Sequence, residues 1–289
     1  MSAVTCLSDH PMPIGKLPSH QDLAKVRVSG GVRVAIDAMD GVSRIADVRE
    51  RDGFKVRFPR RANPPEAILI NTGGGLASGD TIRQDFAIAD NAALTVTTQA
   101  SERVYRALGN AMTRFDVTAT VGAGGKLFWL PQETILFDRA RLKRTISIDM
   151  AASACTLITE TVVLGRAAMG ETFDTGLFLD SWRIRRGGRL VFAENVRLDD
   201  LALRAMPESA VAGGAHVIST TILVAPDAED RLCRVRDVLE RAPYVCAASA
   251  WNGLLVVRGL AHKNEPARRL MAELTPALGI EKLPRVWWT

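Results

Sequence analysis

The sequence predicts a mainly β protein, a β-helix-like scaffold of coiled or stacked strands with two α-helices in its C-terminal half. Between residues 81 and 200, short segments alternate apolar and polar residues, which is the period of a β-strand. Glycine-rich turns separate these segments. Apolar residues recur at helical spacing near residues 227–241 and 264–275. The segments follow no fixed repeat length, so we do not expect a regular solenoid.

The chain divides into two parts by composition. Residues 1–24 contain three prolines and no long apolar run, so we expect a flexible N-terminal segment that is not a signal peptide. Residues 25–289 contain no linker-like stretch, and we expect them to form a single β domain. The chain has 289 residues, of which 47% are hydrophobic, enough for a large core. No segment approaches the length of a membrane span.

The first strands lie in residues 25–58, around predicted turns at Gly30-Gly31 and Asp52-Gly53. A hairpin is expected where Gly187-Gly188 joins two later strands. Eight further strands are expected, and the last two of them form this hairpin. They are residues 81–88, 94–98, 113–121, 126–130, 142–150, 154–164, 177–184 and 189–197.

Two helices follow, and they are expected to pack on a sheet. Asp227 is predicted to cap the first helix and Asn264 the second, because short polar side chains accept hydrogen bonds from free backbone N–H groups. Pro243 and Pro276 are expected near the two helix ends. Between the helices, residues 250–260 predict a strand pair or a bent strand around Asn252-Gly253.

A glycine-rich segment, residues 71–80, follows an apolar run and predicts a tight loop between strands. Its structural glycines are Gly73, Gly74, Gly75 and Gly79. The spacing resembles a phosphate-binding loop, but Asp80 occupies the position of the lysine that binds phosphate. A strand pattern follows instead of a helix, so no helix N-terminus is expected to bind an anion. We therefore expect the chain not to bind nucleotides.

Charge and cysteine content narrow the function classes. The net charge is +5, with arginine and lysine clusters at residues 139–144 and 183–189 that we expect to form solvated strand faces. Aromatic residues are not interleaved with them, which favours an acidic protein partner over nucleic acid. The four cysteines and four histidines show no metal-binding spacing, so we do not expect a preformed zinc site. We also expect no disulfide framework, which indicates a reducing compartment.

Three acidic residues lie within apolar segments: Glu133, Glu160 and Glu171. A carboxylate in such a position must find a partner, bind a cation or shift its pKa. One interpretation is a structural salt bridge, for instance from Arg166 to Glu160 or Glu171. The other is a polar channel whose oxygen atoms bind a divalent cation. The sequence leaves both open.

Four segments together resemble the urease accessory protein family UreD, also called UreH. They are Asn71-Thr-Gly-Gly-Gly-Leu-Ala-Ser-Gly-Asp80, Thr97-Thr-Gln99 with Val104-Tyr-Arg106, Leu130-Pro-Gln-Glu-Thr-Ile-Leu-Phe137 and Leu164-Gly-Arg-Ala-Ala-Met-Gly-Glu171. They occur in the family's order and spacing, and the similarity extends over roughly residues 25–285. Ser101-Glu102-Arg103 departs from the pattern, where the family more often has small residues and lysine.

The resemblance implies a cytoplasmic scaffold for urease maturation and not an enzyme. Such proteins bind apo-urease and the helical partner UreF, recruit the GTPase UreG through UreF, and pass nickel along the assembly. No tightly bound cofactor is implied, and Ni²⁺ is expected only in transit through an interior tunnel. The candidate carboxylates on this path are Asp80, Glu133, Glu160 and Glu171. The alternatives are a carbohydrate-active β-helix enzyme with paired carboxylates and a nucleic-acid binder.

Overall fold

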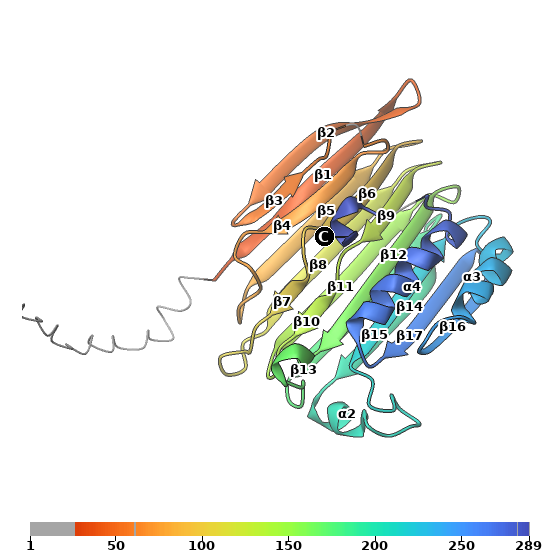
Figure 1. The fold of residues 1–289 in the computed structure, drawn as a ribbon. Coiled ribbons are helices and arrows are strands. Elements are labelled where there is room, and N and C mark those ends of the chain that lie inside the picture. The colour runs from red at the N-terminus through yellow and green to blue at the C-terminus, as the bar shows by residue number, and fades with distance from the viewer. Residues whose placement is uncertain (1–26, 61, 282, 289) are drawn as a thin grey trace, which may run out of the picture.

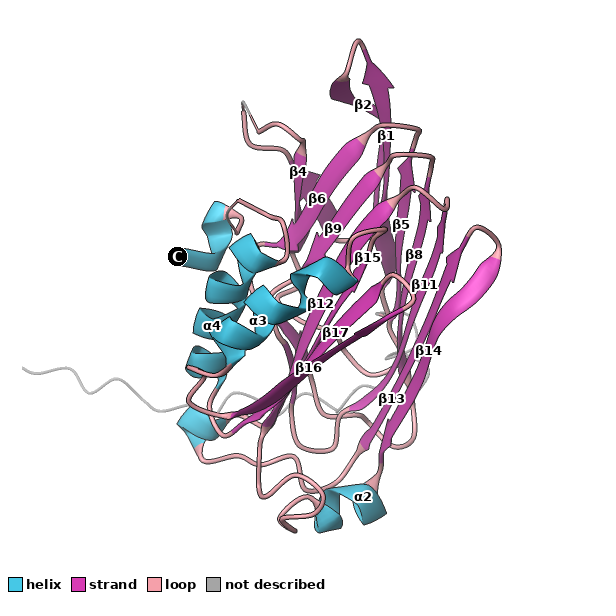
Figure 2. Cartoon of the chain, turned by 90° about the vertical axis from the view of Figure 1, so that its right-hand side faces the viewer, coloured by secondary structure: helices cyan, strands magenta, loops and turns pink. Residues whose placement is uncertain are grey.

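The computed structural model describes residues 27–60, 62–281 and 283–288, and the segment expected to be flexible, residues 1–24, lies outside them. Two β-sheets face each other, and helices cover the outer face of the second sheet (Figures 1 and 2). The first sheet has seven strands in the order β14 (Arg189–Leu198), β13 (Leu177–Arg186), β11 (Arg141–Met150), β8 (Thr113–Val121), β5 (Thr81–Ile88), β1 (Ser29–Met39) and β2 (Val42–Arg51).

The second sheet has ten strands, two of which branch from the main order. The main order is β16 (Val245–Trp251), β17 (Leu254–Ala261), β15 (Val217–Val224), β12 (Cys155–Leu164), β9 (Lys126–Leu130), β6 (Ala93–Thr98), β4 (Glu66–Asn71) and β3 (Phe54–Arg57). The branch consists of β10 (Thr134–Leu136), which pairs with β12 and with β7 (Glu102–Val104).

The middle of the chain winds as a coil between the two sheets. Strands β5, β8, β11 and β13 pair in parallel in the first sheet, while β6, β9 and β12 pair in parallel in the second. The turns of the coil differ in length, because Thr81 pairs with Arg114, Thr113 with Leu142 and Arg141 with Leu177. The predicted class, a coiled β-strand scaffold without a fixed repeat, is confirmed.

Apolar side chains of both sheets fill the space between them, as the alternation in the sequence predicts. On β5, for example, Ile82, Phe86 and Ile88 are buried while Arg83 is exposed. A second apolar layer lies on the other side of the second sheet, where Leu223 and Leu255 pack against helix residues. The ten-stranded sheet is therefore covered on both faces in this region, and its strands β12, β15 and β17 each contain a run of four or five consecutive buried residues.

The expected turn at Gly30-Gly31 is wrong, because both residues lie inside β1. The backbone of β5 passes so close to Gly31 that a Cβ atom there would lie 1.8 Å from the Arg83 carbonyl oxygen. These glycines therefore permit close approach of strands and not chain reversal. The chain instead reverses at Asp40-Gly41, where both residues have positive φ. The turn predicted at Asp52-Gly53 is present.

The helical segments are short, apart from one. They are α2 (Asp200–Ala205), α3 (Leu232–Leu239), α4 (Asn264–Ala277) and the 3₁₀ turns η1 (Ala167–Met169), η2 (Glu229–Arg231) and η3 (Arg285–Trp288). Helices α3 and α4 pack on the second sheet through Val235, Leu270 and Leu274. Helix α2 was not predicted, and its Asp199 accepts hydrogen bonds from two backbone N–H groups in the first turn.

Both predicted helix caps are wrong. Asp227 forms an ion pair with Arg231 at 2.6 Å and caps no helix. Helix α4 begins at Asn264 itself, after Lys263, and the Asn264 side-chain oxygen is buried without a hydrogen-bond partner. Pro276 lies inside the last turn of α4. None of the helices formed by the described residues combines the length and the apolar composition that crossing a bilayer requires.

The two C-terminal tryptophans have different environments. Trp287 is buried, and its indole Nε1 donates to Thr97 Oγ1 and to the Leu130 carbonyl oxygen, both at 3.2 Å. Trp288 is 68% exposed. The 3₁₀ turn η3 therefore fixes the end of the described chain to the second sheet through one of them.

Candidate functional site

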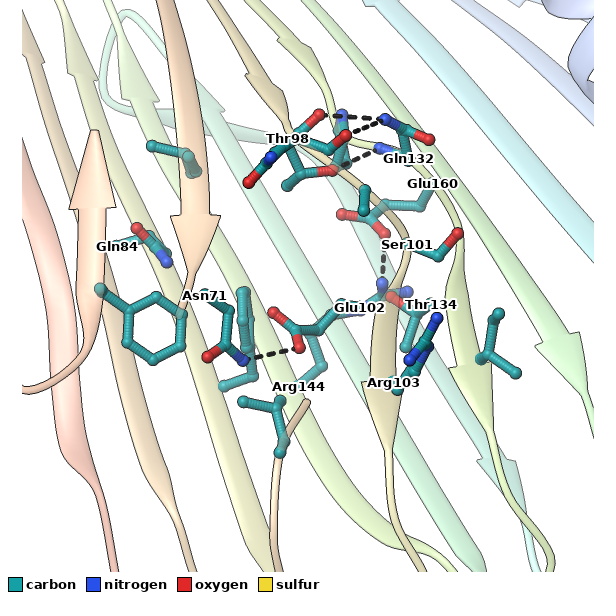
Figure 3. A pocket seen from close by; sticks show the side chains of 18 of the residues that line it. Asn71, Gln84, Thr98, Ser101, Glu102, Arg103, Gln132, Thr134, Arg144 and Glu160 are labelled. Carbon is teal, nitrogen blue, oxygen red and sulfur yellow. Dashed lines mark hydrogen bonds and ion pairs between the residues drawn. The ribbon is translucent and has the colours of Figure 1, made fainter. Parts of the chain in front are cut away.

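An interior cavity of about 340 Å³ lies between the two sheets. Strands of both sheets and the loop before β5 contribute to its wall, and Figure 3 shows the polar side chains around it. The polar lining residues are Asn71, Gln84, Thr98, Gln99, Ser101, Glu102, Arg103, Gln132, Thr134, Arg144 and Glu160. A protein core of this kind is usually apolar, so a cavity with these groups is a candidate functional site.

Three charged side chains form a buried triad at one wall of this cavity: Arg144 on β11, Glu160 on β12 and Asp180 on β13. Arg144 Nε and Nη2 donate to the two Asp180 oxygens at 3.0 and 2.6 Å, and Arg144 Nη1 donates to Glu160 Oε2. The second Glu160 oxygen accepts from Trp129 Nε1 at 2.8 Å. The guanidinium also lies 5.4 Å from the centre of the Phe178 ring.

The triad carries more negative than positive charge, since one arginine faces two carboxylates. Burial raises the pKa of Glu160, although Arg144 and Trp129 act against this shift. Burial acts to lower the pKa of Arg144, but Asp180 and Glu160 outweigh it and raise the value. Arg144 therefore stays charged, and the excess negative charge favours a proton or a cation nearby.

A second, smaller cavity of about 70 Å³ lies on the other side of the triad. Arg144 and Glu160 line both cavities. The smaller cavity is also lined by Glu194 and Arg258, which form an ion pair at the protein surface with distances of 2.5 and 2.7 Å. Polar groups thus line the interior on both sides of the triad, and the triad separates the larger cavity from the smaller one.

Glu102, on β7, lines the cavity and, unlike Glu160, forms no ion pair with an arginine of the described residues. Its Oε1 accepts from Asn71 Nδ2 at 2.9 Å (Figure 3). Burial raises its pKa from the ordinary 4.5 to about 7, while Asn71 and the Arg103 backbone act against the shift and Asp80 adds to it. Glu102 therefore changes charge near neutral pH.

Asp80 is buried and connects the glycine-rich loop to the start of β1. Its two side-chain oxygens accept from the backbone N–H groups of Val28 at 2.9 Å and Ala77 at 2.8 Å. In the same loop, Gly74 has a φ of 73° and its carbonyl oxygen accepts from Tyr105 Oη at 2.9 Å. Strand β5 follows the loop directly. The contacts of Asp80 are those of a residue that shapes the loop.

The other glycines of the loop differ in what they require. Gly79 has a φ of 87°, whereas Gly73 has no positive φ. A Cβ atom on Gly75 would lie 2.7 Å from the Tyr105 ring. Gly75 therefore permits close packing, and Gly74 and Gly79 permit left-handed backbone conformations.

Glu133 lies between the second sheet and the C-terminal segment and is absent from the cavity lining. It accepts from Ser101 Oγ at 2.7 Å, and one of its oxygens lies 3.6 Å from Arg268 on α4. Gln132, next to it, accepts from the same arginine at 3.1 Å. This buried polar contact attaches α4 to the cavity wall.

Glu171 lies away from the interior cavity, at the surface near η1. Arg166 Nε donates to it at 3.1 Å, and the Asp138 backbone N–H donates at 3.2 Å. Hydrogen bonding from Arg166 holds the pKa of Glu171 below its ordinary value. Arg166 also lines an open surface hollow of about 570 Å³, together with His216 and His262. The salt bridge predicted between Arg166 and Glu171 is present, and the structure does not bring Glu171 together with Glu160.

Sequence reasoning missed Arg144, Asp180 and Gln84 as interior residues. Arg144 was expected on a solvated face with its basic neighbours, and this is wrong because it is only 3% exposed. The two-residue period of the strands does place these three residues on a buried face. Arg144 lies between Leu142 and Ile146 at a spacing of two, Asp180 between Phe178 and Trp182, and Gln84 between Ile82 and Phe86, so each shares the inward face of its strand.

The described residues offer no cysteine pair and no cluster of metal-binding side chains at the site. Cys155, Cys233 and Cys246 are free thiols. Within the described part of the chain, no three His, Cys, Asp or Glu side chains gather in a way that could hold a metal ion.

Comparison with known proteins agrees with the resemblance seen in the sequence. The sequence profile of the family described as UreD urease accessory protein matches residues 28–288. Urease accessory protein UreD 2 of Methylorubrum populi is 42% identical over 285 residues, which cover 97% of this chain and 94% of the relative. Urease accessory protein UreD of Rhodopseudomonas palustris (strain HaA2) is 43% identical over 263 residues, 90% and 93% of the two chains. The chain therefore belongs to the UreD family of urease accessory proteins.

Proposed function

We propose that this protein is a cytoplasmic scaffold and metallochaperone for urease maturation. It binds apo-urease and a UreF-type helical partner, recruits a UreG-type GTPase through that partner, and lets nickel pass through its interior to the urease active site. Membership of the UreD family supports the maturation role. The observation that carries the nickel route is the polar cavity between the sheets, with Glu102 and the buried triad in its wall.

The chemistry of this interior suits a cation in transit. Carboxylate and amide oxygens bind nickel more weakly than imidazole or thiolate, so an ion held by them can leave again. The two cavities lie on either side of Arg144 and Glu160, and both residues would have to move, or exchange partners, for an ion to pass between them. A transient route needs no tightly bound cofactor.

The alternative of a carbohydrate-active enzyme finds little support. Such enzymes place two carboxyl groups on either side of a substrate bond, one of them as a proton donor. Glu160 and Asp180 are buried and both bind the same arginine. The space that both of them line is the smaller cavity of about 70 Å³, which is too small for a sugar chain.

The test of this function measures complex formation and nickel loading together. The candidate residues are changed one at a time, as Glu171→Ala, Glu133→Ala, Asp80→Ala and Glu160→Gln. We expect Glu171→Ala to retain the complex with urease and the helical partner but to lower nickel per urease active site. Asp80→Ala is expected to weaken folding, since it removes acceptors for two backbone N–H groups.

The readouts are pull-down of the complex and metal analysis of the matured urease. Full nickel loading with Glu171→Ala would remove that residue from the route. Loss of the complex itself would assign Glu171 to a structural salt bridge with Arg166. A wild-type chain that captures neither apo-urease nor the helical partner would overturn the proposed function as a whole.

A further inference from the structure

The outer face of the second sheet is left open beyond the N-terminus of α4. One row of paired residues crosses four strands of this face and lines the surface hollow of about 570 Å³: Arg103 on β7, Ile135 on β10, Val163 on β12 and Val217 on β15. Residues paired across neighbouring strands point to the same face of a sheet. Val163 packs against a cluster that includes Ala267 of α4, and α4 begins at Asn264 on the rim of the hollow. The hollow is therefore the part of this face that the helix does not reach.

Apolar side chains form the floor of the hollow. Tyr105 and Phe137 meet edge to face, with ring centres 5.2 Å apart, and the Arg166 guanidinium lies 4.2 Å from the centre of the Phe137 ring. Ile135 is half-buried, and Met169, on η1, is 73% exposed. Apolar surface gathered in an open hollow is typical of a binding site, and an exposed methionine adapts to different contacts. The volume also lies within the roughly 300–1,000 Å³ of ligand pockets.

The titratable side chains around this floor are all basic. None of the described Asp or Glu residues lines the hollow, whereas five basic residues do: Arg103, Arg166, His216, His262 and Lys263. Arg166 is paired with Glu171, but Arg103 and Lys263 are exposed and form no ion pair with the described residues. Glu265, two positions after Lys263, pairs with Arg269 instead. Two unpaired cations on the rim therefore attract carboxylates to this face.

These features favour a segment of protein over the other polyanions that a basic surface can bind. A single-stranded nucleic acid stacks its bases on aromatic faces, but Arg166 lies over the Phe137 ring, and the Tyr105 hydroxyl donates to the Gly74 carbonyl oxygen at 2.9 Å. A membrane-binding surface inserts a protruding apolar face into the bilayer, whereas the apolar floor here is concave. A peptide can insert one apolar side chain into the hollow and place carboxylates beside it.

We propose that this hollow docks an acidic segment of a partner protein. The segment inserts a large apolar side chain against Ile135, Phe137 and Met169, and its carboxylates lie against Arg103 and Lys263. This docking site rests on the proposed function and deepens it, because it identifies the surface through which one of the protein partners is recognised.

The test measures the binding of short peptides to the purified full chain, without any complex being formed. Overlapping peptides that tile the sequences of the urease subunits and of the helical partner are immobilised and incubated with the chain. We expect binding to concentrate on peptides in which acidic residues flank a large apolar residue. The peptide that binds best is then labelled, and fluorescence anisotropy gives its Kd, which should rise with added NaCl because salt screens exposed charges.

Variants assign this binding to the hollow. The double variant Arg103→Glu, Lys263→Glu should weaken binding at least about tenfold, since like charges then face each other. Met169→Ser should weaken it about threefold or more through lost apolar contact. The matched control is the double variant Arg33→Glu, Arg189→Glu at exposed positions of the first sheet, which changes the net charge equally and should leave the Kd unchanged. A peptide whose acidic residues are changed to Lys should bind the Arg103→Glu, Lys263→Glu chain better than wild type, a reversal that a folding defect cannot produce.

Equal Kd values for wild type and the Arg103→Glu, Lys263→Glu chain would overturn the proposal, as would the absence of any bound peptide. Binding to phosphatidylglycerol vesicles that depends on these two cations, with no peptide bound, would assign the hollow to a membrane surface instead. Loss of binding in the double variant, with recovery by the Lys-containing peptide, would establish the docking site. The measurement needs no assembled complex, so a failed pull-down would overturn the proposed function without changing this result.

Discussion

Arg144 determines the electrostatics of the interior at the scale of single residues. It neutralises one of two carboxylates in the buried triad and forms part of the wall of both cavities. Removing one partner from a buried ion pair leaves a charge that has lost its water and its counter-ion. The triad is therefore sensitive to single substitutions in a way that exposed ion pairs are not.

Arg144→Met is expected to lower the free energy of unfolding by about 3–5 kcal/mol, because Glu160 and Asp180 then lie buried without a cation. The triple variant Arg144→Met, Glu160→Gln, Asp180→Asn should recover part of this loss. Arg269→Met, which breaks an exposed pair with Glu265, serves as the control and should change stability by less than about 1 kcal/mol. Denaturant unfolding measures all three, and an equal effect of the two single variants would contradict the triad's role.

Glu102 should make the stability of the protein depend on pH. Its pKa is about 7 in the folded chain and 4.5 ordinarily, so between these values the folded chain holds a proton that the unfolded chain has released. The free energy of unfolding contributed by Glu102 therefore falls as the pH rises from 4.5 to 7 and is constant above that. Glu102→Gln removes this dependence.

The variant should match wild type near pH 4.5 and be more stable at pH 8 by about 1–3 kcal/mol. Thermal or denaturant unfolding across this range gives the difference directly. A difference that stays constant with pH would show that Glu102 has an ordinary pKa in the folded protein.

The residues of the candidate site could be predicted from the sequence only in part. Glu160 stood out because it lies within a largely apolar segment, and it does line the cavity. Arg144 did not, because its charged neighbours in sequence suggested a solvated face, although its neighbours two positions away are buried. Glu102 gave no periodic signal, since β7 is a strand of three residues. Its importance depends on the cavity that distant strands form around it.

At the scale of elements, the glycine-rich loop between β4 and β5 is fixed by contacts at both ends. Asp80 accepts from the backbone at Val28 and Ala77, and Tyr105 donates to the Gly74 carbonyl oxygen. Gly74 also lines the interior cavity. A change in the loop is thus expected to affect folding first and the cavity second.

Gly74→Val should destabilise the protein by about 1–3 kcal/mol, because a β-branched residue is strained at a φ of 73°. No atom lies within 4 Å of the position of an added Cβ, so the effect comes from the backbone and not from a clash. Gly74→Ala, which lacks the branch, should lose less. Soluble yield and the unfolding midpoint measure the effect, and a Gly74→Val variant with wild-type stability would contradict it.

Elements were predicted well where a local pattern determines them and poorly where a distant contact does. The hairpin at Gly187-Gly188 and the turn at Asp52-Gly53 follow from local backbone preferences. Gly30-Gly31 has the same composition but lies inside a strand, because β5 passes against it. The two long-range features that define the fold, the order of strands in each sheet and the facing of the sheets, have no local signal.

At the scale of the whole molecule, the first sheet extends beyond the second at the edge strand β2, which projects from the rest of the fold (Figure 2). Ile45 and Val48 pair with the buried Ile36 and Val34, but they are 45% and 37% exposed. Met39 and Val42 at the hairpin end are also exposed. An apolar, unpaired strand edge is a common site of aggregation.

The isolated chain is therefore expected to aggregate, and Ile45→Lys should reduce this. A charge on an exposed edge strand opposes pairing with another chain, and the side chain is not part of the closed core. The change in unfolding free energy should stay below about 1 kcal/mol. Light scattering of wild type and variant at equal concentration is the measurement, with Ser209→Lys, in an exposed turn, as a charge-matched control.

Co-expression with the helical partner should also raise soluble yield, since a scaffold built for partners leaves apolar surface for them to cover. A lone chain that is monodisperse, and whose yield the partner does not change, would count against the scaffold role. The two experiments are independent, because Ile45→Lys acts without any partner.

The attachment of Trp287 to Thr97 and Leu130 has a consequence for biosynthesis. These contacts join residues 190 and 157 positions apart in sequence. A ribosome therefore releases the whole β-coil before it releases the segment that covers the outer face of the second sheet, where Leu223 and Leu255 lie. Until α4 and η3 emerge, the nascent chain presents this apolar face to water, and the covering of the face waits for these two segments to be translated.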